Sequence, residues 1–407
     1  MVDSIGNSFL IIVLPIFLTS GRVSGEFLDL SPVVITGIVL SAFGFFNSGL
    51  QPFVGNFSDR IGKRRLFVVV GLLILTLSNF VYSLVDSYIA VLLVRIAQGL
   101  GVALTVPTTV ALVNELAKKA ARGEAMGIFN TFRMVGFGLG PVIAGRVVTG
   151  GPYTVLTFDI SGFDAAFYIA AFGALVGAIL VWLLVTDPDA DELEDNDGDG
   201  NGGIAVFDEK GDHLLDPVFT LGVSSVFMAI GISLLEPLEH QINMALEQSA
   251  FMFGLEFSAF TLAQIIFQTP IGRWSDMYGR KPFILGGLLI LTPATMIQGF
   301  VGTPVGMIVA RFFQGIAGAA VLAPSMALAG DIAGAGRSGT TLSVLTMSFG
   351  LGVAFGPLLG GTLSGVAVPF GHPYALPFVF GGILGIVGFL MVVTQVEETV
   401  TQRSAVD

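Results

Sequence analysis

Residues Gly55–Arg65 read GNFSDRIGKRR, a polar and basic stretch that stands between two long apolar runs. A second copy, GRWSDMYGRK, occupies Gly272–Lys281 and lacks only one basic position, where Met277 stands. The two copies begin 217 residues apart in a chain of 407 residues. Recurrence at a fixed offset indicates an internal repeat. The sequence therefore predicts that the protein consists of a duplicated unit.

The composition is that of an integral membrane protein. Hydrophobic residues make up 53% of the chain, charged residues only 12%, and the mean hydropathy is +0.85, whereas about a quarter of a soluble domain is charged. Apolar runs long enough to cross a bilayer recur along the whole chain. The first of them has no basic segment before it and no small-residue cleavage pattern, so we expect it to be a retained span.

Twelve apolar spans are predicted, six in each half of the chain. They cover Val2–Thr19, Pro32–Val54, Leu66–Leu84, Tyr88–Leu116, Ala125–Thr149, Ala165–Val185, Val218–Leu235, Ala250–Ile271, Phe283–Gly302, Val305–Ala329, Thr340–Leu363 and Ala375–Thr394. The 54 glycines suit close helix–helix packing, because lipid supplies no hydrophobic drive between helices. An even number of spans per half means that both halves enter the membrane in the same orientation, which predicts a parallel repeat.

Basic residues predict the topology. With both termini placed in the cytoplasm, thirteen Lys and Arg residues lie inside, two lie outside and three lie within spans. This is the expected positive-inside bias. The net charge of −12 argues against nucleic acid as a partner. We expect a multi-pass protein of the plasma membrane.

The acidic segment between spans six and seven predicts the domain organisation. It contains DPDADELEDNDGDGNGG from Asp187 onward, a composition too polar to form a core. We therefore expect an N-terminal six-helix bundle (1–186), a cytoplasmic linker (187–216), a C-terminal bundle (217–394) and a cytoplasmic tail (395–407). The linker also matches the spacing of a calcium loop from Asp197 to Asp208, although neither flank has the pattern of the helix that such a loop requires.

The repeat extends beyond the opening motif, at offsets of 216 or 217 residues. The matching pairs are Gly37–Phe43 with Gly254–Phe260, Arg95–Gly99 with Arg311–Gly315, Glu115 with Asp331, and Gly136–Pro141 with Gly352–Pro357.

With these motifs the chain resembles the major facilitator superfamily of secondary transporters. GNFSDRIGKRR resembles the signature loop of that family between helices 2 and 3, and RIAQGLGVA at Arg95–Ala103 resembles its helix 4 motif. GFGLGPVIAG at Gly136–Gly145 is similar to the helix 5 motif of drug and proton antiporters. The resemblance implies an all-α membrane fold of twelve helices in two bundles, a central cavity open alternately to each side, and no covalent catalysis.

The signature loops are candidates for a cytoplasmic gate. The resemblance implies that they latch one conformational state, with the acid at the inner end of span four as partner; alternatively, their basic residues only anchor the topology. The candidate gating residues are Gly55, Asp59, Arg60, Gly62, Lys63, Arg64 and Glu115 in the first half, and Gly272, Asp276, Gly279, Arg280 and Asp331 in the second.

Two further motifs lie inside the spans. A charged residue there needs a partner or a watery cavity, so Arg95 and Arg311 serve either proton coupling or a structural hydrogen-bond network. Glycines and a proline in span five permit bending and close packing, which suggests either a hinge that separates antiport from leak or ordinary packing. The motif residues are Arg95, Gln98, Gly99, Arg311, Gln314 and Gly315 for helices 4 and 10, and Gly136, Gly140, Pro141, Gly145, Gly356 and Pro357 for the antiporter-like motif.

Ionisable residues that break the repeat are the substrate or proton candidates. Arg133 matches Phe349 in the other half, and Glu256 matches Val39. Each serves either transport or an internal ion pair or hydrogen bond that holds the bundle together. Asp3 and Glu236 are further candidates, and Glu236 lies with Glu239 and His240 at the outer end of span seven, where we expect loop residues.

The predicted function is secondary active transport by alternating access, with proton-coupled efflux of a drug-like molecule or metabolite. The alternative is a proton- or cation-coupled uptake symporter for a sugar or organic anion, with Arg133 as the anion anchor. A membrane sensor without transport activity is a remote alternative. An intramembrane enzyme is also a remote alternative. The three histidines are dispersed along the chain, which leaves few residues for a catalytic site.

We expect no cofactor and no metal. The expected partners are a small-molecule substrate, a coupling proton and the bilayer, and we expect a monomer.

Overall fold

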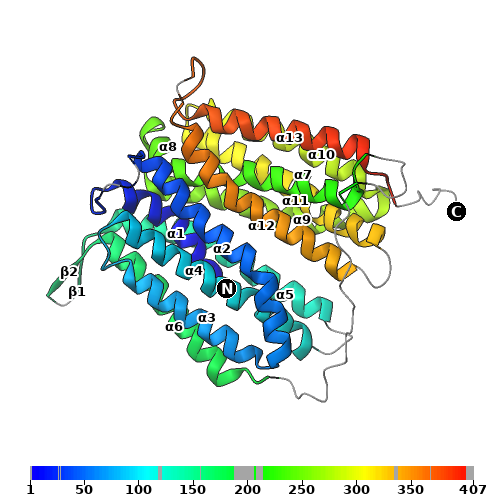
Figure 1. Cartoon of the computed structure of the whole chain (residues 1–407). Helices are drawn as coiled ribbons and strands as arrows, with labels where there is room; N and C mark the ends of the chain where they lie inside the picture. Colours follow the sequence, from blue (N-terminus) through cyan, green and yellow to red (C-terminus); the bar gives the residue numbers. More distant parts are fainter. Residues whose placement is uncertain are drawn as a thin grey trace. The chain divides into compact units, whose positions relative to one another are not determined.

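Helices make up nearly all of the described structure (Figure 1). The computed structural model describes residues 2–25, 27, 29–117, 122–155, 157–187, 206–207, 214–333, 338–366 and 368–399. Ten of the described helices are long and apolar enough to cross a membrane. The shorter apolar α1 and the glycine-rich α5 complete the set, so the predicted all-α membrane fold is confirmed.

The first half of the chain contains six long helices and one hairpin. These are α1 (Val2–Thr19), α2 (Pro32–Ile61), α3 (Arg64–Val81), α4 (Tyr88–Leu116), α5 (Arg122–Gly150), β1 (Tyr153–Val155), β2 (Phe158–Ile160) and α6 (Gly162–Leu184). The antiparallel hairpin, which pairs Tyr153 with Ile160, was not predicted. It extends beyond the ends of α5 and α6 in Figure 1.

The second half follows the same order, with one broken span. Its elements are α7 (Pro217–Ser233), the 3₁₀ helix η3 (Glu236–Leu238), α8 (Glu239–Ala245), α9 (Ala250–Tyr278), α10 (Arg280–Met296), the 3₁₀ helix η4 (Ile297–Gly299), α11 (Pro304–Ala333), α12 (Ser338–Leu363) and α13 (Ala375–Gln395).

The chain divides into two compact units. Unit 1 comprises Met1–Asp195, Glu236–Ser258 and Gly360–Thr362, and unit 2 comprises Asn196–Leu235, Ala259–Leu359 and Leu363–Asp407. Unit 1 thus contains α1 to α6 together with η3, α8 and the first turns of α9. Most of the predicted linker, and with it the calcium-loop spacing, lies outside the described residues.

Small residues bring the helices of unit 1 close together. A Cβ at Gly71 of α3 would lie 2.6 Å from the Gly101 carbonyl oxygen of α4, and one at Gly101 would lie 3.0 Å from the Gly71 carbonyl oxygen. Glycine is therefore required at both positions for the observed approach. The adjoining core consists of Val68, Leu72, Leu75, Val102, Ala174 and Ala178.

Unit 2 repeats this packing. A Cβ at Gly287 of α10, the repeat counterpart of Gly71, would lie 3.0 Å from the Ala320 Cβ of α11. The core beside it includes Leu221, Met228, Ile284, Leu288 and Val321, all almost completely buried. The repeat read from the sequence is therefore also a repeat of helix contacts.

Two predicted boundaries were wrong, and both lie at the signature loops. We expected Gly55–Arg65 to form a turn, but α2 continues to Ile61 and the turn consists of Gly62 and Lys63. Similarly, α9 continues to Tyr278 and ends at Gly279. Hydropathy marks where a helix leaves the apolar layer, whereas the helix itself ends at a glycine with positive φ, 69° at Gly62 and 104° at Gly279.

The outer end of span seven also differs from the prediction. We expected loop residues after Leu235, but the chain continues through η3, which packs against α1 and α2, into α8, which packs against α1. Glu236 and Glu239 are consequently buried, with exposed fractions of 8% and 0%. Their burial depends on contacts with the first half of the chain, which hydropathy does not report.

Candidate functional site

The signature loop of the first half contains a short ion pair. Arg64, at the start of α3, lies 2.6 Å from a carboxylate oxygen of Glu115, near the end of α4, and both side chains are largely shielded from solvent. Arg60 and Lys63 are exposed. The side chain of Asp59 lies outside the described residues. Of the basic residues predicted to meet Glu115, the structure therefore places Arg64 against it.

The signature loop of the second half has the matching arrangement. Arg280 pairs with Asp331, and it also lies 3.3 Å from Asp276. Thr399, just after α13, donates a hydrogen bond of 3.0 Å to Asp331. Asp331 is the repeat counterpart of Glu115, so the basic–acidic pair across the loop is present in both units.

The first glycine of each signature motif, Gly55 or Gly272, is not a point of close helix approach in the described structure. Within 4 Å of a Cβ built at either position no heavy atom of a neighbouring segment lies in the described structure. Each carbonyl instead accepts a hydrogen bond from a serine three residues later, Ser58 at 2.9 Å and Ser275 at 2.8 Å.

An acidic residue after the last helix of each half caps the third helix of that half. Asp187 accepts a hydrogen bond of 2.7 Å from the Arg65 amide, and Glu398 accepts one of 2.8 Å from the Lys281 amide. Carboxylates at a helix N-terminus satisfy amides that have no partner within the helix. Sequence reasoning missed these caps, although an acid directly after the sixth span of each half was a usable signal.

Arg95 belongs to a buried hydrogen-bond network in unit 1. Its guanidinium donates to Gln98 Oε1 at 3.0 Å, and the Tyr82 hydroxyl donates to the same oxygen at 2.9 Å. Gln98 Nε2 donates to Asn79 at 2.7 Å. The guanidinium carbon also lies 4.3 Å from the centre of the Phe43 ring. Polar partners and an aromatic face thus compensate a charge inside an apolar helix.

Arg311 occupies the equivalent network in unit 2. It donates to Gln314 Oε1 at 2.6 Å and to the Ile232 carbonyl at 3.2 Å, and its guanidinium carbon lies 4.9 Å from the Phe260 ring. Gln314 Nε2 donates to Thr295 at 2.9 Å. Phe260, Thr295 and Gln314 are the repeat counterparts of Phe43, Asn79 and Gln98.

The motif glycines Gly99 and Gly315 allow these networks to form. A Cβ at Gly99 would lie 2.9 Å from the Phe43 carbonyl oxygen, and one at Gly315 would lie 2.8 Å from the Ala263 side chain. Both glycines therefore let the arginine helix approach the neighbouring helix that supplies the phenylalanine.

The antiporter-like motif of α5 packs against two helices. On one side, a Cβ at Gly140 would meet the Ser8 hydroxyl of α1 and would lie 2.9 Å from the Ile5 carbonyl oxygen. Ser8 donates to the Gly136 carbonyl at 3.4 Å. In unit 2, a Cβ built at the corresponding Gly356 would lie 3.0 Å from the Ile230 carbonyl oxygen.

The other side of α5 contacts the first turns of α9, within unit 1. A Cβ at Gly145 would lie 2.5 Å from the Ala250 carbonyl oxygen, and one at Gly254 would lie 2.5 Å from the Pro141 carbonyl oxygen. Ser258 donates a hydrogen bond to the Gly138 carbonyl. Pro141 and its counterpart Pro357 are both buried inside their helices.

Buried carboxylates gather in unit 1 near the broken span. Glu256 is completely buried in α9, where its repeat counterpart Val39 is equally buried in α2. Glu239 of α8 lies close enough to Glu256 for their charges to interact, and Glu236 of η3 interacts with Arg95 in the same way. Glu236 and Glu256 were candidates from sequence, whereas Glu239 was expected to be a loop residue.

The remaining candidates lie apart from this cluster or outside the described residues. Arg133 is half-buried in α5, with its guanidinium carbon 5.9 Å from the centre of the Phe129 ring. The side chain of Asp3 lies outside the described residues. Among the described residues, no three His, Asp or Glu side chains lie close enough to hold a metal ion.

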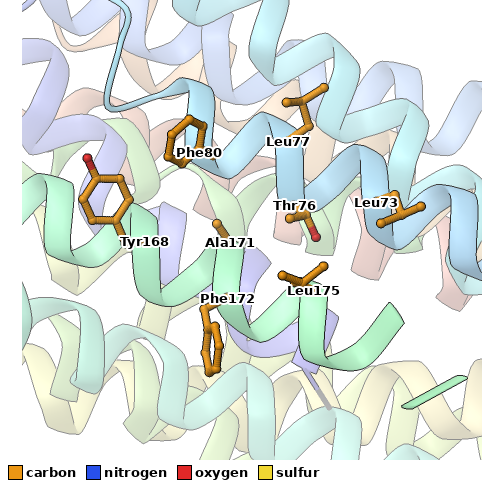
Figure 2. A pocket seen from close by; sticks show the side chains of 8 residues that line it. All are labelled: Leu73, Thr76, Leu77, Phe80, Tyr168, Ala171, Phe172 and Leu175. Atoms are coloured by element: carbon orange, nitrogen blue, oxygen red, sulfur yellow. The ribbon is translucent and has the colours of Figure 1, made fainter. Parts of the chain in front are cut away.

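An open apolar groove of about 460 Å³ lies between α3 and α6. Figure 2 shows its lining, which is polar only at Thr76 and Tyr168: Leu73, Thr76, Leu77, Phe80, Tyr168, Ala171, Phe172 and Leu175. A lining without charged groups suits hydrocarbon chains of the bilayer, so this groove is separate from the ionisable site.

Comparison with known proteins identifies the family. The sequence profile of the Major Facilitator Superfamily matches residues 1–244 and 219–406. Multidrug resistance protein 2 of Bacillus subtilis (strain 168) is 24% identical over 397 residues, which cover 94% of this chain and 90% of the relative. An uncharacterized MFS-type transporter of Methanocaldococcus jannaschii is 28% identical over 187 residues, 46% of this chain. The chain spans 47% of the length of that relative.

A eukaryotic relative and two solved transporter structures are also similar to this chain. The chromaffin granule amine transporter of Rattus norvegicus is 26% identical over 352 residues, which cover 83% of this chain and 62% of the relative. A D-xylose-proton symporter has a similar fold, with a TM-score of 0.74, 16% identity and coverage of 98% of this chain and 97% of the symporter. A bacterial homolog of the human lysosomal transporter Spinster superposes with a TM-score of 0.72 at 17% identity, covering 97% and 92% of the two chains. The chain therefore belongs to the major facilitator superfamily and is a membrane transporter of that family.

Proposed function

We propose that this transporter exports a small molecule in exchange for protons, by alternating access. The observation that supports this best is Glu256, a carboxylate with no exposed surface in an apolar helix, where the other half of the repeat has Val39. Burial favours the protonated form of an acid over the charged form. A single acid added to one half of a repeat can thus bind a proton in one state of the cycle and release it in the other.

The relatives support export as the direction. One is named a multidrug resistance protein, and another, the tetracycline resistance protein class B of Escherichia coli, is 29% identical over 188 residues, which cover 46% of this chain. Resistance through a transporter requires that the compound leaves the cell. The α5 glycines that pack on both α1 and α9 give the antiporter-like motif a physical role as a hinge between helices.

The signature loops are proposed to act as cytoplasmic latches. The pairs Arg64–Glu115 and Arg280–Asp331 each connect two helix ends within one unit. A conformational change that separates these helix ends has to break a charge pair, which raises the energy of the open state. The two pairs would therefore resist any opening of the cytoplasmic side that moves the helix ends of one unit apart.

The proposed moving bodies are the two repeats, residues 1–186 and 217–394, joined by the acidic linker 187–216 and followed by a cytoplasmic tail at 395–407. The bias of Lys and Arg supports a plasma-membrane protein with both termini in the cytoplasm. We propose that each chain acts as a monomer.

The test is proton movement in proteoliposomes that contain the purified protein and a luminal pH dye. A proton gradient is imposed, and lipophilic cations, sugars and organic acids are added outside in turn. Proton release from the lumen on addition of a compound supports antiport, and Glu256→Gln should abolish it. The exposed Glu124 of α5 provides the control, because Glu124→Gln removes a carboxylate without touching the interior.

Proton entry together with the compound would instead show symport and would overturn the export proposal. A wild-type pH dependence in Glu256→Gln would remove this residue from the mechanism. The same assay thus separates the export proposal from uptake of a sugar or organic anion.

A further inference from the structure

The β1–β2 hairpin is a feature of unit 1 that unit 2 does not repeat. The corresponding connection of unit 2, between α12 and α13, contains no strand among its described residues. That connection folds onto its own unit: the His372 amide donates to the Gly299 carbonyl at 3.0 Å, and the Phe370 ring stacks on Phe300 with ring centres 6.2 Å apart. The hairpin of unit 1 instead projects from the helix ends (Figure 1). A segment that only one repeat has is not required for the shared fold.

The base of the hairpin is fixed to the ends of its two helices. The Tyr153 hydroxyl donates a hydrogen bond of 2.9 Å to the Val147 carbonyl of α5. A Cβ at Gly151 would lie 2.5 Å from the Gly162 amide nitrogen of α6, and one at Gly162 would collide with the Val148 carbonyl. The two helix ends therefore meet at glycines with no room for a side chain between them. This close contact sets the direction in which the hairpin leaves the bundle.

The register of the hairpin gives it one apolar face and one polar face. Tyr153 pairs with Ile160, and Thr154 pairs with Asp159. Opposite residues share a face and successive residues of a strand alternate between faces, so Phe158 lies on the face of Tyr153 and Ile160. On the other face the Thr154 hydroxyl donates a hydrogen bond of 2.8 Å to Asp159. Phe158 is 72% exposed, so the apolar face is not covered by the described part of the chain.

The position of α6 places the hairpin at the membrane surface. This helix has 23 residues and is therefore about 34 Å long, close to the thickness of about 30 Å of a hydrocarbon core. The exposed Trp182 near its far end suits one interface, so Gly162 at its start reaches the other. The hairpin ends at Ile160, just before that start.

The direction of the hairpin turns one of its faces toward the bilayer. In Figure 1 it leaves the ends of α5 and α6 sideways instead of continuing along the helix axes. A hairpin at this level that runs sideways lies along the membrane surface. An isolated two-stranded hairpin is only marginally stable in water, and removal of its apolar face from water is favourable. The headgroup region of the adjacent lipids offers such a cover.

A basic side chain at the base of the hairpin adds charge complementarity. A Cβ built at Gly150 would lie 2.6 Å from the Tyr153 hydroxyl and 2.9 Å from a guanidinium nitrogen of Arg146. Arg146 is exposed, whereas the neighbouring Asp164 is paired with Arg22 at 3.3 Å. An exposed cation at the level of the headgroups attracts anionic phospholipids.

We propose that the hairpin docks on the bilayer beside unit 1, with Phe158 at the boundary between headgroups and acyl chains and Arg146 on the phosphate of an anionic phospholipid. Amphipathic segments with aromatic residues on the apolar face bind membranes at this depth. With the predicted topology the leaflet is the outer one. The docked hairpin holds the ends of α5 and α6 at a fixed depth. This surface is separate from the ionisable site and is independent of the direction of transport.

The absence of cysteine from the chain allows a test with a single fluorescent label. Thr154→Cys and Phe158→Cys, each labelled with bimane, place the same fluorophore on the two faces at exposed positions. The protein is reconstituted in vesicles of phosphatidylcholine and phosphatidylglycerol. The label at position 158 should be quenched by a nitroxide attached near the headgroup end of a lipid acyl chain and protected from aqueous acrylamide. The label at position 154 should show the reverse.

The role of charge is tested by Arg146→Gln with the label at position 158. The measured quantity is the ratio of acrylamide-protected to acrylamide-accessible label. In the anionic vesicles this variant should lower the ratio by about fivefold, the effect of one basic residue near an anionic surface. Vesicles of pure phosphatidylcholine are the control, and there the variant should match the protein with Arg146. An unchanged ratio in the anionic vesicles would refute the contact between Arg146 and the phosphate.

A second set of variants keeps the label away from the proposed anchor. Bimane is attached at the exposed turn residue Thr157 through Thr157→Cys. In this background Phe158→Ser should increase quenching by acrylamide, because it removes the apolar anchor. Thr154→Ser is the matched control on the polar face and should leave the quenching unchanged.

Two results would overturn the docking. Equal quenching of positions 154 and 158 by acrylamide would show that both faces lie in water. Protection at position 158 without quenching by the lipid nitroxide, and increasing with the ratio of protein to lipid, would show that a second copy of the chain covers the apolar face.

Discussion

At the scale of single residues, each unit contains a buried arginine whose charge needs polar or aromatic partners. Arg95 and Arg311 each sit in an apolar helix, and each is compensated by a glutamine three residues later and by a phenylalanine ring. A buried hydrogen-bond network of this kind resists rearrangement, because breaking one bond leaves a buried group without a partner. Both arginines therefore connect helices of their own unit, and Arg95 additionally has an electrostatic interaction with Glu236.

The Arg64–Glu115 pair yields a residue-scale prediction. Arg64→Gln and Glu115→Gln should each lower the transport rate, and the double variant should be no slower than either single variant, because both changes remove the same ion pair. For a pair this shielded we expect a coupling energy on the order of 1 kcal/mol. Initial rates of substrate-driven proton release in vesicles provide the measurement.

Arg60→Gln is the control for this cycle, since Arg60 belongs to the same loop but is exposed. It should leave the rate nearly unchanged. If the losses of the two single variants simply add up in the double variant, the residues act independently and the latch is refuted.

At the scale of the helices, α5 packs closely on two neighbouring helices through its glycines. Gly140 faces α1 and Gly145 faces α9, each at a distance that a side chain would not permit. Two glycine faces on one helix, with Pro141 between them, allow α5 to pack tightly on two neighbours at once. Such a helix transmits movement of one neighbour to the other more directly than a helix with long side chains would.

A pair of glycine substitutions in α5 tests this requirement. Gly140→Ala should destabilise the protein by about 1–3 kcal/mol, because the added methyl would meet Ser8 and the Ile5 carbonyl. Gly127→Ala makes the same chemical change in the same helix, where no neighbouring atom lies within 4 Å of the new Cβ in the described structure. It should be neutral or stabilise the helix by up to about 1 kcal/mol.

Thermal unfolding of the two variants in detergent gives the comparison. Gly140→Ala should melt several degrees below wild type, and Gly127→Ala at or above it. Equal melting temperatures for the two variants would show that α1 and α5 adjust without strain, and would contradict the packing argument.

At the scale of the whole molecule, duplication explains why so many contacts occur twice. The helix approaches at Gly71 and Gly287, the arginine networks and the acidic caps at Asp187 and Glu398 all recur between the units. The buried acids do not recur, since Val39 stands where the second half has Glu256. Function in a duplicated transporter is expected where the two halves differ, because the shared contacts already suffice for the fold.

The acidic linker gives the prediction for the whole molecule. Deletion of Asp191–Gly203 should leave insertion, transport and the melting temperature unchanged within about 2 °C, because a segment so polar cannot bury a core. The chain on either side is anchored, by Asp187 to Arg65 and by the Leu214 and Leu215 amides to Gln395.

A variant with Asp191–Gly203 replaced by a Gly–Ser segment of equal length separates the effect of length from that of charge. Loss of folding in the deletion but not in the replacement would show that the length of the linker is needed. Loss in both would mean that the acidic residues contribute to the fold, contrary to our interpretation.

The sequence by itself determined the class, the spans and the repeat. Membrane spans are set by local hydrophobicity, which each segment has regardless of its neighbours, so α1 and α4 begin and end where we expected. The paired motifs could also be found in the sequence, because duplication preserves residue types at a nearly constant offset of 216 or 217 residues. Even the partners Arg64 and Glu115 could be proposed, since topology places their helix ends on the same side.

Only the tertiary structure decided which ionisable residues are buried together. Glu239 follows an apolar span and reads as a loop residue, and its burial arises because η3 packs against α1 and α2, and α8 against α1, in the first half of the chain. In spans that are apolar on all sides, periodicity does not show which face meets a neighbour. The grouping of the buried acids is therefore a property of the packed helices, whereas the existence of those helices is a property of the local sequence.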